Sequence, residues 1–154
     1  MDATQDNRPK SVIRPAQESD CAALTELMMR SNAYEGRYRS IIANYPVTPA
    51  MVRTGETWVI EHEGEIAGFY RLDIAGAELD LMFVDDRRQG SGVGRMLFEH
   101  MLAVAAENGL TVVKIVSHPP TVEFYRRMGA TEIGVSRAKQ PDGWDRPVLQ
   151  LAVT

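Results

Sequence analysis

The most informative segment of this 154-residue chain is a glycine-rich loop, Gln89-Gly90-Ser91-Gly92-Val93-Gly94. A strand-like apolar segment at 78–84 precedes it, and a helical pattern closed by Asn108-Gly109 follows it. The apolar stripe of that helix is expected to contain Val93, Met96, Leu97, Met101 and Val104. A second apolar segment lies at 111–117. A strand, a loop, a helix and a strand form a βαβ unit, so the two strands are predicted to be parallel.

The loop has the composition of an anion-binding site. Glycines let the backbone approach a ligand closely, and the N-terminus of the following helix offers free N–H groups and a positive dipole end. Arg87, Arg88 and Arg95 add positive charge beside it. The spacing lacks the lysine of a Walker loop, and its third glycine comes one position too early for the dinucleotide fingerprint. We therefore predict a pyrophosphate site of another kind. The alternative is a turn whose glycines only pack a helix closely on a sheet.

The residues before the loop predict an antiparallel meander. Strands are expected at 57–61, 66–72 and 78–84, joined by short glycine-containing turns. In the third strand, three apolar residues alternate with three others, which predicts one apolar and one mostly polar face. The apolar set is Leu79, Leu81 and Phe83, and the other set is Glu78, Asp80 and Met82.

The remaining segments complete a mixed fold. A strand at 12–15 and a helix beginning near Ser19-Asp20 come first, and short helices are expected between 33 and 55. A short helix and two strands end the chain, at 121–128, 131–135 and 148–153. We predict one α/β (α+β) domain spanning 1–154, with the meander followed by the βαβ unit and helices on both faces. Residues 1–10 are expected to be disordered.

Composition and charge exclude several functional classes. The chain is 44% hydrophobic and 25% charged, which is typical of a globular domain. Its 17 basic and 21 acidic residues give a net charge of −4, so it has no general attraction for nucleic acid or an anionic membrane. One cysteine, Cys21, and three scattered histidines predict neither a disulfide nor a metal site. With no leader-like or membrane-spanning run, we expect a cytoplasmic protein.

Four segments, in order along residues 12–153, resemble the GNAT superfamily of N-acetyltransferases. Gln89-x-x-Gly92-x-Gly94, after the strand that ends at Val84, resembles the coenzyme A pyrophosphate loop of that family. The segment Phe124-Tyr125-Arg126-Arg127-Met128-Gly129 resembles its Phe-Tyr-x-x-x-Gly motif. Ile13-Arg14-Pro15-Ala16 and Glu63-Gly64-Glu65-Ile66-Ala67-Gly68 resemble its first strand and second hairpin.

This resemblance implies an acetyl-CoA-dependent N-acetyltransferase that transfers the acetyl group directly to a primary amine. The coenzyme would lie against Met82, Phe83, Val84, Gln89, Gly90, Ser91, Gly92, Val93, Gly94 and Arg95. Two alternatives remain open: a non-catalytic acyl-CoA-binding regulatory module, and a transferase that uses another acyl-CoA donor. We expect a small-molecule acceptor rather than a protein, and a homodimer is compatible with the family.

The resemblance also implies two catalytic residues. Glu78 matches the strand carboxylate that acts as general base in some members. Asp80 shares its face of the strand, and a water molecule is the third candidate for the base. Tyr125 matches the hydroxyl near the coenzyme sulfur, and a phenol with a pKa of about 10 stays protonated and able to donate to a departing thiolate. His118 stands where the family often has asparagine, and we assign it no role.

Overall fold

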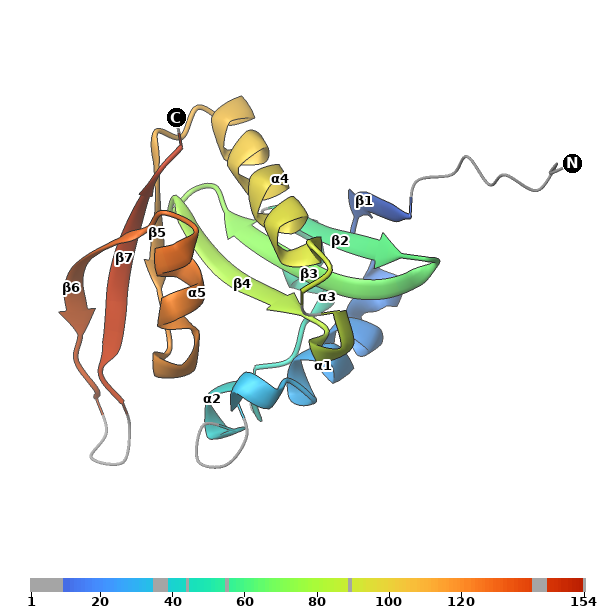
Figure 1. Cartoon of the computed structure of the whole chain (residues 1–154), viewed down its shortest axis with the longest axis horizontal. Helices are drawn as coiled ribbons and strands as arrows, with labels where there is room; N and C mark the ends of the chain where they lie inside the picture. Colours follow the sequence, from blue (N-terminus) through green and yellow to red (C-terminus); the bar gives the residue numbers. More distant parts are fainter. Residues whose placement is uncertain are drawn as a thin grey trace, which may run out of the picture.

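The computed structural model describes residues 10–34, 39–43, 45–54, 56–88, 90–139 and 144–153. These residues form a sheet with the strand order β1-β2-β3-β4-β5-β7-β6 (Figure 1). The strands are β1 (Ser11–Pro15), β2 (Glu56–His62), β3 (Glu65–Asp73), β4 (Glu78–Val84), β5 (Val112–Val116), β6 (Thr131–Ser136) and β7 (Arg146–Ala152). The helices are α1 (Cys21–Met29), α2 (Arg39–Ala43), α3 (Pro49–Arg53), α4 (Val93–Glu107) and α5 (Val122–Arg127).

The first four strands form the predicted antiparallel meander. Strand β1 pairs with β2, β2 with β3 and β3 with β4, all antiparallel. The β2–β3 hairpin turns at Glu63 and Gly64, which both have positive φ angles. The mixed α/β class is confirmed.

Strand β4 departs from the predicted division into an apolar and a polar face. Leu79 and Leu81 pair with neighbouring residues of β3, so Asp80 is an extra residue that forms a β-bulge. The bulge reverses the alternation. Leu79 therefore packs in the core beneath α4, whereas Leu81 and Phe83 pack in a second core beneath α1. Both faces of β4 contribute to a core, and the expectation of one polar face is wrong.

Strands β4 and β5 are parallel, as the βαβ pattern predicts, but they pair at a single register position, Glu78 with Lys114. The Lys114 backbone N–H donates to the Ala77 carbonyl at 2.8 Å beside it. Beyond this point the two strands diverge (Figure 1), and β5 pairs along its whole length with β7 instead. The later part of β4 thus has no paired strand on this side among the described residues.

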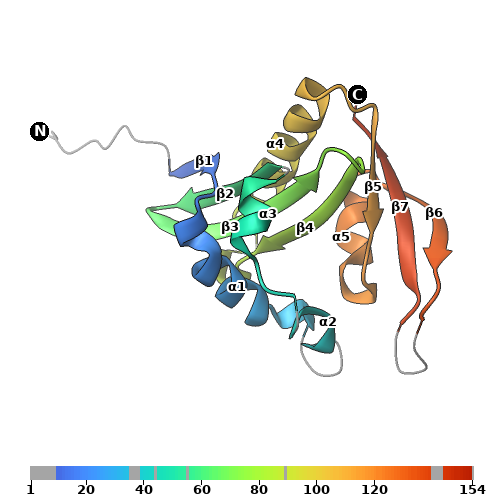
Figure 2. The same cartoon turned by 180° about the vertical axis from the view of Figure 1, so that it is seen from behind.

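Helices cover both faces of the sheet, as predicted. Helices α4 and α5 lie on one face, and α1, α2 and α3 lie on the other (Figure 2). The buried stripe of α4 lacks one predicted residue, Met96, which is 40% exposed, and contains two that were not predicted, Phe98 and Ala105. In the short helix α3, Thr48 caps the first turn by accepting a hydrogen bond from the Met51 N–H. None of the described helices has the length and apolar character needed to cross a membrane.

Candidate active site

The glycine-rich loop, the end of β4 and α5 enclose a cavity of about 450 Å³, the loop-side cavity. Its lining includes most residues predicted to bind the coenzyme: Met82, Phe83, Val84, Gly90, Gly92, Gly94 and Arg95. Two predicted residues lie elsewhere. The Ser91 hydroxyl donates to the Arg88 carbonyl, and Val93 is buried in the core. Gln89 lies outside the described residues.

Backbone conformation explains two of the loop glycines. Gly90 and Gly92 have φ angles of 83° and 86°, in the left-handed region that favours glycine, and Gly92 is the N-cap of α4. A Cβ added at either position would meet no heavy atom within 4 Å. Close packing of helix on sheet therefore does not explain these two residues, and the space beside them is open to a ligand.

Two of the three arginines expected to supply charge at the loop already form ion pairs. Arg87 Nη2 lies 2.8 Å from Asp85, and Arg88 Nη2 lies 3.0 Å from Glu65. The Arg87 guanidinium holds the pKa of the buried Asp85 carboxyl well below its usual range. Arg95 has a looser contact, 3.9 Å from Glu99. Arg127, which the sequence did not single out, also lines the loop-side cavity.

A second cavity of about 440 Å³ lies between β4, β5 and the first residue of β7, and we call it the β7-side cavity. Glu78, Asp80, His118 and Arg146 bring four ionisable side chains to its wall. Five residues line both cavities: Tyr34, Met82, Phe83, Thr121 and Tyr125. The two cavities therefore share a boundary beside the divergence of β4 and β5.

Tyr125 occupies this boundary. It is 7% exposed, and its burial, with a smaller effect of the nearby Tyr34, raises the pKa of its phenol above the usual range. The phenol therefore keeps its proton at neutral pH. Among the described residues, no group hydrogen-bonds to this hydroxyl, so its proton is available to a ligand.

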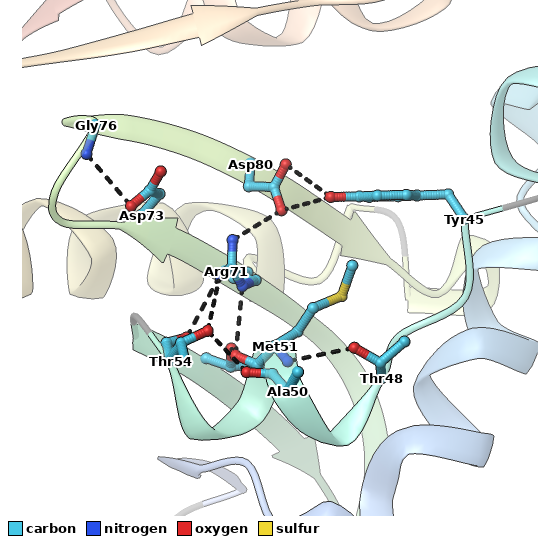
Figure 3. A network of polar contacts seen from close by, with 10 residues as sticks. Tyr45, Thr48, Ala50, Met51, Thr54, Arg71, Asp73, Gly76 and Asp80 are labelled. Atoms are coloured by element: carbon cyan, nitrogen blue, oxygen red, sulfur yellow. Dashed lines mark hydrogen bonds and ion pairs between the residues drawn. The ribbon is translucent and has the colours of Figure 1, made fainter.

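Asp80 is held firmly by a polar network (Figure 3). Its Oδ2 accepts from the Tyr45 hydroxyl at 2.9 Å and from Arg71 Nη1 at 3.0 Å. Arg71 also donates to the carbonyl of Met51 and the hydroxyl of Thr54, which anchors the network to the α3 region. Burial and the hydrogen bond to Asp80 raise the pKa of Tyr45 to about 12. The Asp80 carboxylate thus has two strong donors already in place.

Glu78 is less constrained. Its Oε1 lies 3.5 Å from Lys114 Nζ, and both side chains are partly exposed. No other ion pair or side-chain hydrogen bond of Glu78 occurs within the part of the chain that the structure describes. Of the two carboxylates in the β7-side cavity, Glu78 is the one with freedom to meet a ligand.

His118 is a neutral acceptor in this structure. Its Nε2 lies 3.2 Å from Arg146 Nη2, which can only donate. Burial and the adjacent Arg146 lower the pKa of His118 to about 4. With Nε2 accepting a hydrogen bond, the proton of the neutral ring belongs on Nδ1, so His118 has no free basic nitrogen in this arrangement.

A cluster of hydroxyls at the same boundary gave no signal in the sequence. Ser117 Oγ lies 2.9 Å from Thr121 Oγ1, and both hydroxyls contact the His118 carbonyl at 3.1 Å. The buried Tyr34 phenol lies beside Thr121, and its ring meets that of His118 edge-on, with the centroids 5.9 Å apart. Tyr34 is the first residue of a sequence segment, 34–39, that contains two tyrosines and two arginines, and residues 35–38 of it lie outside the described residues. Spacing along the chain could not reveal this cluster, because Tyr34 comes from a different element.

Several side chains outside the two cavities have a structural role. Trp58 packs against His100, with ring centroids 4.6 Å apart. Burial raises the pKa of the Cys21 thiol, which disfavours the reactive thiolate. The described residues contain no cluster of three or more His, Cys, Asp or Glu with metal-binding geometry.

Comparison with known proteins agrees with this geometry. The family model described as "Acetyltransferase (GNAT) domain" matches residues 53–129, from the end of α3 to the end of the Phe-Tyr-x-x-x-Gly motif. The peptidyl-lysine N-acetyltransferase YjaB of Salmonella typhimurium is 32% identical over 122 residues, covering 79% of this chain and 77% of that protein. The 5-NmdU N-acetyltransferase of Pseudomonas phage PaMx11 is 31% identical over 110 residues, covering 68% of this chain and 79% of that protein.

A solved structure shares the fold at low sequence identity. The GCN5-related N-acetyltransferase from Rhodopseudomonas palustris superposes with a TM-score of 0.76 at 16% identity, covering 94% of this chain and 96% of that chain. The family match, the two relatives and this architecture agree with the resemblance of the loop and the Phe-Tyr motif. The chain therefore belongs to the GNAT superfamily of N-acetyltransferases.

Proposed function

We propose that this protein transfers the acetyl group of acetyl-CoA to a primary amine, with the coenzyme in the loop-side cavity and the amine in the β7-side cavity. The observation that carries the proposal is the shared boundary of the two cavities at Tyr125. A pantetheine arm laid along the unpaired side of β4 would bring a thioester to this boundary. The pyrophosphate would lie at the start of α4, where the helix dipole favours an anion.

The proposed reaction is a direct transfer. The neutral amine nitrogen attacks the thioester carbon, the new C–N bond forms, and the C–S bond breaks. The nitrogen loses a proton to Glu78 or to water, and the departing thiolate gains a proton from Tyr125. An alkyl amine with a pKa of about 10.4 is mostly protonated at neutral pH, so deprotonation must come before attack.

Glu78 is a better candidate for the base than Asp80. The Asp80 carboxylate already accepts from Arg71 and Tyr45, whereas Glu78 has one loose contact with Lys114. The two donors fix the position of the Asp80 carboxylate, so it is less free than the Glu78 carboxylate to move toward an amine. We assign Asp80 a role in shaping the cavity and Glu78 the proton transfer, directly or through one water molecule.

The nature of the acceptor follows from the size and chemistry of its cavity. The names of both relatives specify transfer to nitrogen, on a peptidyl lysine in one case and on 5-NmdU in the other. A cavity of about 440 Å³ with carboxylates on its wall suits a small cationic amine. We propose a small molecule as the acceptor.

Native mass spectrometry with acetyl-CoA, followed by a panel of primary amines, tests the proposal. A mass increase that matches acetyl-CoA, and then acetylated product with at least one amine, supports it. Tight binding without transfer to any amine would favour a non-catalytic acyl-CoA-binding module. Preferential turnover of propionyl- or succinyl-CoA in competition would identify another donor. Failure to bind any acyl-CoA would contradict the proposal at its first step.

A further inference from the structure

Arg146 places a guanidinium group in the wall of the β7-side cavity. It is the first residue of β7 and is half-buried. Its Nη2 donates to the Val116 carbonyl at 2.8 Å and to His118 Nε2 at 3.2 Å. Both acceptors are uncharged, so these contacts position the group without neutralising it.

Arg146 differs in this respect from the two cations that pair with the carboxylates of the cavity wall. Arg71 has Asp80 at 3.0 Å, and Lys114 has Glu78 at 3.5 Å. Within the described residues, no carboxylate lies within ion-pair distance of Arg146, and its buried Nε has no hydrogen-bond partner. The carboxylates of Glu78 and Asp80 act on Arg146 only at longer range.

A buried charge without a counter-ion is unfavourable, because desolvation is not compensated by a close opposite charge. Burial accordingly lowers the pKa of Arg146. A guanidinium with unused N–H donors in a cavity is complementary to a carboxylate, which it binds with charge-assisted hydrogen bonds. One wall of the cavity therefore carries Glu78, whose carboxylate has only a loose contact with Lys114. A second wall carries Arg146, which has no carboxylate within ion-pair distance among the described residues.

We propose that Arg146 binds a carboxylate of the acceptor, so that the substrates are small amines that also carry a carboxylate. This inference rests on the proposed acetyl transfer to an amine. The amine end faces Glu78 and the boundary with the coenzyme, and the acidic end faces Arg146. The two walls thus set the direction in which the acceptor enters.

Matched pairs of amines test the inference directly. The first pair is 5-aminopentanoate and pentylamine, which differ at the carboxylate end. The second pair is Nα-acetyl-lysine and its amide, which asks whether a carboxylate is needed when a peptide-like carbonyl is present. A hydrogen bond to a charged group contributes enough for at least about a tenfold effect. We expect kcat/KM to be at least about tenfold higher for the carboxylate member of at least one pair.

The variant Arg146→Gln should remove this preference. We expect KM for the carboxylate substrate to rise about tenfold or more relative to KM for pentylamine, with little change in acetyl-CoA affinity. Arg146→Lys should restore part of the preference, because it keeps the charge but not the planar fork. Arg137→Gln is the matched control, since Arg137 is an exposed arginine near β7 that pairs with Asp145.

Competition in the unmodified protein covers the case in which Arg146→Gln does not fold. Pentanoate should inhibit transfer to pentylamine competitively, and pentanol should not. Equal kcat/KM within both pairs, or a preference that persists in Arg146→Gln, would overturn the inference and leave the proposed acetyl transfer intact. Bound acetyl-CoA with no transfer to any of the four amines, and no effect of pentanoate on amine binding, would overturn both.

Discussion

Replacement of Gly68 by alanine should distort the loop-side cavity, because the added methyl group would displace the neighbouring strand β4. Gly68 lies in β3 opposite Val84, and a Cβ there would sit 2.7 Å from the Phe83 carbonyl oxygen and 3.3 Å from the Val84 Cα. Ordinary contacts begin at 3.4 Å, so β4 must move by about 0.7 Å to relieve the closest one. Both obstructing atoms are backbone, and no side-chain rotation can make room.

The expected effect has a stability and a function component. Overpacking in a tight core typically costs about 1–3 kcal/mol, and Gly68→Ala should lower the free energy of unfolding by that amount. Phe83 and Val84 also line the loop-side cavity. Because a misplacement of about 1 Å can reduce a rate about 100-fold, the shift in β4 should lower kcat/KM for acetyl-CoA by about tenfold or more.

Urea denaturation and steady-state kinetics with varied acetyl-CoA measure the two effects in Gly68→Ala. Gly134→Ala is the matched control: Gly134 also lies in a strand, but a Cβ there meets no heavy atom within 4 Å. That variant should change the free energy of unfolding by no more than about 1 kcal/mol. Gly68→Ala with unchanged stability would refute the steric argument. Lower stability with unchanged kcat/KM for acetyl-CoA would refute the link between this backbone position and the cavity.

Three further predictions concern side chains of the site. Tyr125→Phe should reduce kcat about 100-fold or more while acetyl-CoA affinity stays nearly constant, as measured by steady-state kinetics and titration calorimetry; loss of affinity with normal kcat would contradict the proton-donor role. Glu78→Gln should lower kcat about 100-fold near pH 7 and recover as the pH approaches the pKa of the amine, whereas a base role for water alone would leave its pH profile unchanged. His118 has a pKa of about 4 in the folded protein and about 6.5 in the unfolded chain. Between these two pH values the unfolded chain binds the extra proton, so the free energy of unfolding is highest above pH 6.5 and decreases as the pH falls toward 4. In urea denaturation of the unmodified protein, the free energy of unfolding should fall by about 1–3 kcal/mol over this pH range, and by less in His118→Asn. The same pH dependence in both proteins would contradict the assignment to His118.

The fold could be predicted from the sequence because its signals are local. Strand and helix periodicity, the turn at Glu63-Gly64 and the loop Gln89–Gly94 each lie within one short segment. The bulge at Asp80 could not be predicted. The letters of 78–84 alternate regularly, and only the pairing with β3 inserts the extra residue. The reversal of faces in β4 is therefore a property of the sheet and not of the strand.

The part of the candidate site that could be predicted is the part formed by the main chain of β4 and the glycine-rich loop. Met82, Phe83, Val84 and three glycines line the expected cavity, since a loop between a strand and a helix has few ways to lie. The ion pairs of the arginines around the site could not be predicted from the sequence. Arg87 and Arg88 stand beside the loop in sequence, but Asp85 and Glu65 hold them. The role proposed for Arg146 could not be predicted from the sequence, because it depends on which side chains the fold places within ion-pair distance of the guanidinium.

The bulge in β4 connects these observations. It lets Leu79 fill the core beneath α4 while Leu81 and Phe83 fill the core beneath α1, so both sides of the strand are anchored. A strand fixed on both faces can leave one edge unpaired without losing its place. That edge is where β4 separates from β5 and where the two cavities meet at Tyr125. Asp80, the extra residue, is also the carboxylate bound by Arg71 and Tyr45. The Asp80 carboxylate therefore has a structural role, which is why we propose Glu78, held only by a loose contact with Lys114, for the proton transfer.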